Sequence, residues 1–356
     1  MIRKWRRTLS KIRLFVLMLL SLPFGTDGYT VGQNLEVHQV HPAWSPTEEL
    51  IAFVAVRSDG DTRADLWTMN SDGSNAVNRT YTMVTFYNGL PKWSPNGDYL
   101  AFRSGSDVDS TRNDLLILDP TQNSIINLTS DISEGVVSPD FAWSPNSEYL
   151  AFLVGSSVGN HDLYVADVNK TFLMRLTLPE SGFNHYPGWM SDDVVTVVND
   201  DDILTAISIE DSSVTELLPM PISSYSISSD RQFITYMTTP DLAYYDLWLI
   251  SLEDQHVVQL ASNLFLPESD LVWSYQNDKF LFQIGCDDEN SAIWQVAVTS
   301  QVQTNLTGCD NAYNFHPSWS PDGNHIVFQS DRLGVMSLWN MNADGSNPIN
   351  LVVRSE

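Results

Sequence analysis

Few residues of this chain have the types and spacings that support chemistry. The sequence contains no H-E-x-x-H, paired C-x-x-C, Walker loop or dinucleotide glycine fingerprint. The stretch from Gly155 to Gly159 (GSSVG) matches G-x-S-x-G in its letters. A nucleophile elbow needs a helix after the serine, and here a polar stretch leads into another expected strand. The sequence therefore offers no established catalytic motif.

Two histidines and a carboxylate could form a metal site if the chain closes into a ring. His41, Asp270 and His316 each stand three residues before a recurring tryptophan, a position expected on the innermost strand beside a central channel. Imidazole and carboxylate ligands suit zinc, manganese or a similar ion. The favoured alternative is that His-Pro is how the repeat enters its inner strand, with the imidazole hydrogen-bonded to backbone. His185 could add a third histidine if its Asn-His-Tyr-Pro segment turns inward.

The same position recurs along the whole chain and supplies further candidates for ligand binding in the channel. In chain order it holds His41, Leu90, Asp140, Tyr186, Ser224, Asp270 and His316. We take His41, Asp140, Tyr186, Asp270 and His316 as the channel candidates for ligand binding.

Acidic side chains gather in segments expected to join the second and third strands of each repeat. The rim candidates are Asp59, Asp61, Asp107, Asp109, Asp287 and Asp288. Clustered carboxylates could hold calcium. None of these segments has EF-hand spacing, so a solvated acidic rim is the favoured interpretation.

The only two cysteines, Cys286 and Cys309, are expected to form a disulfide. Cys286 opens a loop between two expected strands, and Cys309 lies in the connection to the next repeat. Strand alternation brings both segments to the same end of the molecule. An oxidising compartment would allow the pair to bridge.

One repeat of about 46 residues organises the chain. Its clearest copies begin WSPTEELIAF at Trp44, WSPNGDYLAF at Trp93, WSPNSEYLAF at Trp143, WSYQNDKFLF at Trp273 and WSPDGNHIVF at Trp319. Two degenerate copies, WMSDDVVTVV at Trp189 and ISSDRQFITY at Ile227, bring the number to seven. Because only 38 residues separate these two, the fourth unit should be the smallest.

Each copy predicts four strands. A turn such as Asn96-Gly97 follows Ser-Pro, and a continuous apolar run such as LIAFVAV predicts a strand buried on both faces. A second signature, such as Asp65-Leu66-Trp67, opens the next strand. Four strands per unit of this length predict an all-β, seven-bladed β-propeller of four-stranded antiparallel blades, over residues 39–354.

Charge excludes some classes of partner. Acidic residues outnumber basic ones by 44 to 18, for a net charge of −26. Such a surface repels phosphate backbones and anionic lipids, so we expect no nucleic-acid partner. It favours solubility, and we expect a monomer.

The first 28 residues have the layout of an export signal. Six basic residues between Arg3 and Arg13 precede the apolar run from Leu14 to Leu22 (LFVLMLLSL), which is too short to span a bilayer. We expect cleavage within 24–30, a lead-in over 29–38, no membrane span in the mature chain, and a periplasmic or secreted location. Since the signal holds six basic residues and one acidic, the mature chain would carry net charge −31.

The repeat resembles that of the TolB-like β-propellers, most closely in WSPDGNHIVFQSDRLG and LWNMNADGSNPINL near the C-terminus. The resemblance covers Gln39 to Leu351. It is not to TolB as a whole, because TolB has an α/β domain before a six-bladed propeller, and only about fifteen residues separate this signal from the first repeat. The resemblance implies an exported propeller that binds a partner or ligand at one end.

The favoured function is an extracytoplasmic, non-catalytic scaffold that binds an envelope or extracellular protein or glycan. The one candidate cofactor is a divalent ion (calcium, manganese or zinc) in the channel or the acidic segments. The alternative is a metal-assisted enzyme acting on acidic polysaccharide, because some TolB-like relatives are oligogalacturonate lyases that use central histidines and a metal. A third interpretation, a cell-wall glycan or peptide module, requires exposed aromatics at one end. Its candidates are Phe86, Tyr87, Tyr244 and Tyr245.

Overall fold

The computed structural model describes residues 37–57, 63–81, 83, 87–105, 113–132, 136–155, 161–177, 185–240, 244–265, 271–287, 290–309 and 312–351. These residues form 28 strands and, among themselves, no helix. The all-β prediction is confirmed. No described residue belongs to a helix long and apolar enough to cross a bilayer.

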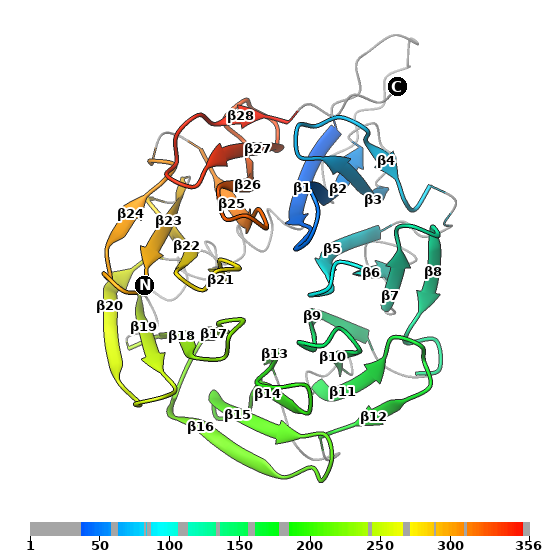
Figure 1. Cartoon of the computed structure of the whole chain (residues 1–356), viewed down its shortest axis with the longest axis vertical. Coiled ribbons are helices and arrows are strands. Elements are labelled where there is room, and N and C mark those ends of the chain that lie inside the picture. The colour runs from blue at the N-terminus through cyan, green and yellow to red at the C-terminus, as the bar shows by residue number, and fades with distance from the viewer. Residues whose placement is uncertain are drawn as a thin grey trace, which may run out of the picture.

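The strands follow one another in groups of four, from the centre of the molecule outward (Figure 1). The innermost strands are β1 (Val37–Trp44), β5 (Tyr87–Trp93), β9 (Val136–Trp143), β13 (His185–Trp189), β17 (Ser224–Ile227), β21 (Val272–Trp273) and β25 (Asn314–Trp319). The second strands are β2 (Leu50–Arg57), β6 (Leu100–Gly105), β10 (Tyr149–Gly155), β14 (Val194–Val198), β18 (Phe233–Thr238), β22 (Lys279–Gly285) and β26 (His325–Ser330). The third strands are β3 (Ala64–Asn70), β7 (Asn113–Asp119), β11 (His161–Asp167), β15 (Ile203–Ser208), β19 (Tyr245–Ser251), β23 (Ser291–Ala297) and β27 (Ser337–Asn342). The outermost strands are β4 (Val77–Asn78), β8 (Ser124–Asn127), β12 (Leu173–Arg175), β16 (Val214–Pro221), β20 (Val257–Leu264), β24 (Gln303–Asn305) and β28 (Ile349–Asn350).

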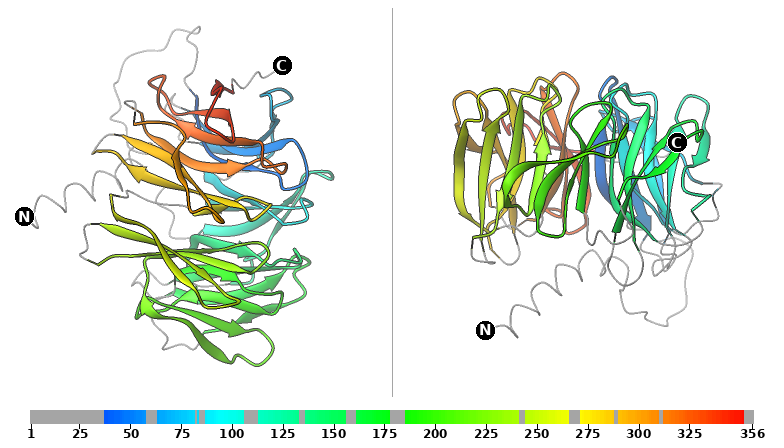
Figure 2. Two further views of the ribbon diagram at one scale, coloured as in Figure 1. Left: turned by 60° about the vertical axis from the view of Figure 1, so that its left-hand side comes forward. Right: turned by 90° about the horizontal axis from the view of Figure 1, so that it is seen from below.

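These strands build a β-propeller of four-stranded antiparallel blades. The strands β9–β28 form five four-stranded sheets, each made of consecutive strands. The strands β1–β8 form one eight-stranded sheet, whose two halves repeat the same antiparallel order and are joined by a single parallel bridge between Ala64 and Tyr87. The sheets surround a central axis, and the side view shows a disc (Figure 2).

The disc has two ends, which we name by their connections. The turns that follow the recurring tryptophans, such as the one at Gly97, lie at the turn end. The second and outermost strands end, and the third and innermost strands begin, at the opposite end, which we call the loop end. Gly97 and Gly323 have φ of 78° and 71° in their turns, which explains the Asn-Gly and Asp-Gly pairs there.

Apolar clusters fill the spaces between neighbouring groups of strands. The second strands are buried along almost their whole length, as their continuous apolar runs predict. Ala52 and Leu66, for example, pack against Phe102 of the next group. At the junction of the first and last groups, Trp44 packs with Val327 and Leu351. The core is therefore a ring of interfaces rather than one central mass.

The recurring tryptophans link neighbouring groups by a repeated hydrogen bond. The indole Nε1 of Trp93 donates to the Ala43 carbonyl at 3.0 Å. Trp143 donates in the same way to Lys92 at 2.9 Å, and Trp189 to Ala142 at 3.0 Å. Each acceptor is the residue just before the tryptophan of the preceding group. This explains why the repeat keeps tryptophan at a position where another apolar residue would also fill the core.

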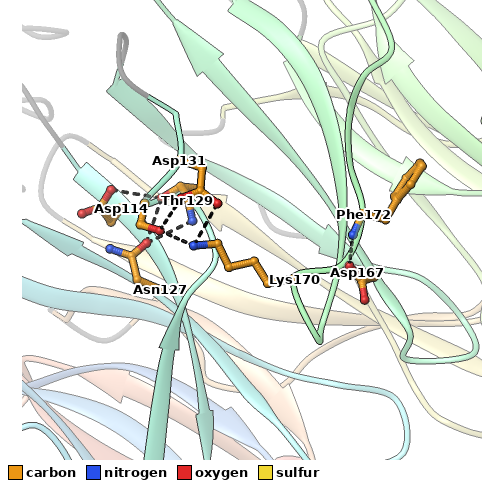
Figure 3. A network of polar contacts seen from close by, with 8 residues as sticks. Asp114, Asn127, Thr129, Asp131, Asp167, Lys170 and Phe172 are labelled. Atoms are coloured by element: carbon orange, nitrogen blue, oxygen red, sulfur yellow. Dashed lines mark hydrogen bonds and ion pairs between the residues drawn. The ribbon is translucent and has the colours of Figure 1, made fainter.

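A polar network holds the short outer strand β8 (Figure 3). Thr129 Oγ1, which follows β8, accepts from the Leu115 amide at 3.0 Å and donates to Asp114 at 3.0 Å. Asn127 Oδ1 accepts from the Thr129 amide at 3.0 Å. The Asp-Leu and Asn-x-Thr signatures are thus the two halves of one structural motif. Lys170, from the next sheet, reaches Asp131 at 3.1 Å.

The prediction that the fourth unit is the smallest is wrong for its strands. Its outer strand β16 has 8 residues, more than β4, β8 or β12. The missing length lies at the loop end, where Pro221 ends β16 and Ser224 already begins β17. The unit is short in its connections.

Candidate functional site

A β-bulge in the inner strands presents the predicted channel residues. Register shifts occur between Val40 and Ala43, between Gly89 and Lys92, between His185 and Gly188, and between Phe315 and Ser318. Inside these bulges lie His41, Leu90, Tyr186 and His316, with left-handed φ of 52°, 57°, 51° and 45°. Each is followed by proline.

This backbone is costly for residues with a side chain. A non-glycine residue in the left-handed region costs of order 1–3 kcal/mol. A following proline adds a restriction of its own, because it pushes the residue before it toward extended conformations. The arrangement occurs four times. Because β-bulges change the direction of a side chain, we infer that these bulges direct the four side chains to one place.

The bulges line a central cavity of about 600 Å³. His41, Leu90, Asp140, Tyr186, Ser224 and His316 all border it, so the structure brings these six predicted positions together. The seventh, Asp270, lies outside the described residues. Lys92 and Arg231 border the cavity as well, and neither was among the sequence candidates.

His41 and His316 form a close pair across the junction of the first and last groups. Their ring centroids are 4.7 Å apart and the planes are inclined by 48°. The His41 amide donates to Gln329 Oε1 at 2.8 Å, which fixes its backbone to β26. Two imidazoles at this separation could belong to a metal site. Among the described residues, however, no third histidine, cysteine or carboxylate completes a metal-binding group.

The charge of the cavity differs from that of the molecule. Lys92 Nζ donates to the Phe141 carbonyl at 2.8 Å and lies 4.9 Å from the centre of that ring. Burial lowers the pKa of Arg231, an effect opposed by Asp192 and Asp230. Both cations line a cavity inside a chain with net charge −26. Lys92 and Arg231 thus place two positive charges on a cavity that also has the Asp140 carboxylate in its lining.

The carboxylate of the same cavity lining belongs to Asp140. Its charge opposes the lowering of the pKa of Arg103 by burial. The pKa of His161 is lowered, first by burial and second by the neighbouring His185. Asp140 opposes this lowering, as does Asp162. The His161 and His185 rings have centroids 6.2 Å apart. Sequence reasoning missed Arg103 and His161, because both belong to strands other than the inner one.

Tyr225 holds Tyr186 in place. Its hydroxyl donates to the Tyr186 carbonyl at 2.8 Å and shares a 2.8 Å hydrogen bond with Thr196. Ile227 stands where other repeats have tryptophan, so Tyr225 supplies the link between groups that the indole would otherwise make. A Cβ on Gly188 would lie 2.7 Å from the Tyr225 hydroxyl, which explains the glycine.

His185 does not join the His41 and His316 pair. It borders a second cavity of about 270 Å³ at the loop end, with Asp202, Ser223 and Thr239 among its other walls. Tyr186 borders both cavities. The condition set for His185 as a third ligand is therefore not met.

Most of the predicted acidic rim cannot be placed. Asp59, Asp61, Asp107, Asp109 and Asp288 lie outside the described residues, as does Phe86 among the aromatic candidates. Asp287 is described, and both its oxygens accept from Asn290 Nδ2 at 2.9 Å. Of the other aromatic candidates, Tyr244 is exposed, whereas Tyr87 and Tyr245 are half-buried.

The predicted disulfide is present. Cys286 and Cys309 are bonded, with their Cα atoms 5.9 Å apart. The bond joins the connection after β22 to the segment after β24, both at the loop end.

Comparison with known proteins supports the fold. No protein-family profile matches the chain. An uncharacterized protein of Agrobacterium fabrum is 24% identical over 183 residues, which is 50% of this chain and 61% of that protein's length. The structure resembles an oligogalacturonate lyase in complex with manganese, with a TM-score of 0.67, 14% identity, and coverage of 86% of this chain and 90% of that one.

Two further structures have the same architecture. The β-propeller domain of the Trilobed protease from Pyrococcus furiosus, described as having an open velcro topology, gives a TM-score of 0.61 at 13% identity over 89% of this chain and 98% of that one. TolB from Acinetobacter baumannii gives a TM-score of 0.55 at 14% identity over 80% of this chain and 66% of that one. The chain therefore has a TolB-like β-propeller fold.

Proposed function

We propose that this protein is an exported, non-catalytic binding scaffold that takes part of a protein or other ligand into its central cavity. The observation that carries the proposal is the set of left-handed residues before proline at His41, Leu90, Tyr186 and His316. Strain of this kind persists only where surrounding structure enforces it, and it concentrates at ligand sites. Here it aims four side chains at one cavity.

The proposal includes the architecture predicted from seven motif copies. We interpret the eight-stranded sheet as two blades, β1–β4 and β5–β8, which gives seven blades over residues 39–354. The single bridge between Ala64 and Tyr87 supports this interpretation, as does the apolar cluster between the two halves. A crystal structure would count the blades directly, and six or eight would refute the interpretation.

The proposed location is the periplasm or the extracellular space, with residues 1–28 as signal and 29–38 as lead-in. The basic and apolar layout of the signal supports export, and so does the disulfide. N-terminal sequencing of the exported protein should give a mature start between residues 24 and 30. An intact Met1 in a soluble cytoplasmic protein would contradict export.

Capture of a partner from an envelope extract tests the binding function. The mature protein should retain a discrete partner, and the Tyr186→Ala variant should lose it, because Tyr186 lines the central cavity and is 44% exposed. Tyr81→Ala is the matched control, since Tyr81 is 72% exposed and follows the outer strand β4. Equal loss from both variants would show that the cavity is not the site.

A second candidate is a metal-assisted enzyme acting on acidic polysaccharide, and the His41 and His316 pair favours it. The described residues supply two ligands to such an ion, so we derive no catalytic step through it. Elemental analysis of the purified protein should show about one bound ion if the candidate is right, lost in a His41→Ala/His316→Ala double variant. Metal content that is nil, or unchanged in that variant, leaves the scaffold function.

A further inference from the structure

Two connections of the fourth unit at the loop end are short. The four residues from Asn199 to Asp202 join β14 to β15, and Ile222 and Ser223 alone join β16 to β17. The Ile222 amide donates to the Asp202 carbonyl at 2.8 Å, which ties the two connections together. Where longer connections would stand, there is a cavity of about 270 Å³, which we call the notch.

The notch and the central cavity share one residue. Tyr186 borders both, and its side chain is 44% exposed although it lies on an inner strand. Its backbone is fixed by its left-handed φ, by Pro187, and by the hydrogen bond from Tyr225 to its carbonyl. A molecule that lies across this ring can therefore occupy the central cavity at one end and the notch at the other. Such a molecule must be chain-like.

The walls of the notch have the chemistry of a sugar site. The Tyr186 ring has apolar faces, and Asp202, His185, Ser223 and Thr239, whose side chains are polar, border the same cavity. A sugar ring matches both halves of this surface, since it has apolar C–H faces and a rim of hydroxyls. These polar groups are side chains rather than the free edge of a strand, which a bound extended peptide would require.

The charged residues beside the notch restrict the class of sugar that it can bind. Among the described residues that border the notch there is no lysine or arginine, whereas Lys92 and Arg231 border the central cavity. Asp202 contributes a carboxylate to the notch, and Asp200 and Asp201 are exposed in the same short connection. A uronic acid would have no countercharge here. A free amino group would have one.

We infer that the notch binds part of an oligosaccharide that lacks acidic groups and carries free amino groups, with a sugar ring against Tyr186 and an ammonium group beside Asp202. The inference deepens the proposed binding function and rests on it. It also separates that function from the acidic-polysaccharide alternative, because the two require ligands of opposite charge.

Calorimetric titration of the mature protein tests the inference with three ligands of matched length: β-1,4-linked glucosamine oligomers, their N-acetylated counterparts, and galacturonate oligomers. We expect the glucosamine oligomers to bind most tightly and more weakly as salt is added. The Asp202→Asn variant should weaken that binding roughly tenfold, the loss expected for a charge-assisted hydrogen bond. Tyr186→Ala should weaken all sugar binding, and Tyr186→Phe should retain it.

Glu216→Gln is the charge control, because Glu216 is an exposed carboxylate on β16 outside the notch. Tighter binding of galacturonate than of glucosamine oligomers would overturn the inference, and so would glucosamine binding that Asp202→Asn leaves unchanged. If no sugar binds while Tyr186→Ala still abolishes partner capture, the inference fails and the scaffold function stands. If Tyr186→Ala changes neither measurement, both fail.

Discussion

At the scale of single residues, the repeat signatures are explained by hydrogen bonds that cannot be left unmade. The Thr129 hydroxyl is the partner of the Leu115 amide, and Leu115 itself is buried. Thr80 and Thr307 make the same bond to Leu66 and Ile293. A buried amide without a partner costs about 1–3 kcal/mol. The threonine is therefore a structural requirement where a short outer strand is followed by one, as after β4, β8 and β24.

Thr129→Val tests this requirement. It keeps the shape of the side chain but removes the acceptor for Leu115, so the free energy of unfolding should fall by about 1–3 kcal/mol. The control is Thr121→Val, since the Thr121 hydroxyl donates to Asp119 in an exposed turn. Urea unfolding should show a loss for Thr129→Val well above that of the control. Equal losses would mean that the buried amide finds another partner.

The contact between Gly188 and Tyr225 gives a second prediction. Gly188→Ala places a methyl group against the Tyr225 and Thr196 hydroxyls, and should destabilise the fold by about 1–3 kcal/mol. Tyr225→Phe removes one of the two clashing oxygens, so the alanine should cost less in that background. A double-mutant cycle measures the difference. Strictly additive costs would contradict a direct contact.

Stability should also fall in alkaline solution. Burial raises the pKa values of Tyr225 and Tyr236 above the ordinary value of about 10. The folded chain keeps these protons to a higher pH than the unfolded chain does. The contribution of these two tyrosines to the free energy of unfolding should therefore be level up to about pH 10 and decrease above it. Tyr225→Phe should make this decrease shallower, and an unchanged slope in that variant would contradict the effect of its burial.

Which residues the sequence could reveal depended on whether they share the repeat. The position three residues before the recurring tryptophan site was visible because it repeats at a fixed distance, and six of its seven members border one cavity. Arg103 and His161 have no counterpart in the other repeats, so no spacing pointed to them. Tyr225 was hidden for a related reason, because it compensates for a tryptophan that its own repeat has lost.

At the scale of elements, the innermost strands carry the candidate site and the outermost ones close the interfaces between groups. Strand order and the buried second strands could be predicted, because seven copies of one pattern reinforce one another. The length of β16 could not be predicted, since an exposed edge strand needs few apolar residues. The notch could not be predicted from the sequence either, because it results from short connections between strands of ordinary length.

The outermost strand β28 provides a test at this scale. Leu351, which follows it, is 2% exposed and packs with Trp44 and Ile51 at the junction of the first and last groups. Deletion of Pro348–Glu356 should remove this contact and the edge strand together, and should lower the melting temperature by several degrees. Deletion of Arg354–Glu356 is the control, because it retains Leu351. Unchanged melting in the longer deletion would contradict the strand assignment.

At the scale of the whole molecule, the ring closes by side-chain and backbone contacts between its ends. Within the described residues, the first and last groups of four each consist of consecutive strands, and no strand is exchanged between them. The Gln39 amide donates to the Met336 carbonyl at 3.0 Å, and the Trp44 amide to Ser318 Oγ at 2.9 Å. The His41 and His316 pair lies at this junction, so the cavity is intact only while the ring is closed.

The disulfide is a covalent link within this ring, and it contributes both to stability and to the argument for export. Cys286 and Cys309 are separated by 23 residues. In the chain-entropy model, closing a loop of this length stabilises the folded state by about 3 kcal/mol. Reduction should therefore lower the denaturant midpoint without changing the fold, and a Cys286→Ser/Cys309→Ser variant should behave like the reduced protein in both redox conditions.

The bond also reports the compartment, because thiols stay reduced in the cytosol and pair in the periplasm or outside the cell. Protein made with residues 1–28 and recovered from outside the cytoplasm should show no free thiol when it is denatured without reductant. Protein made without those residues should show two, and should regain the midpoint of the exported form after oxidation. Free thiols in the exported protein would contradict its proposed location in an oxidising compartment. The role of the bond is tested separately in exported protein without free thiols: if its midpoint equals that of the double-serine variant, the bond contributes nothing to stability.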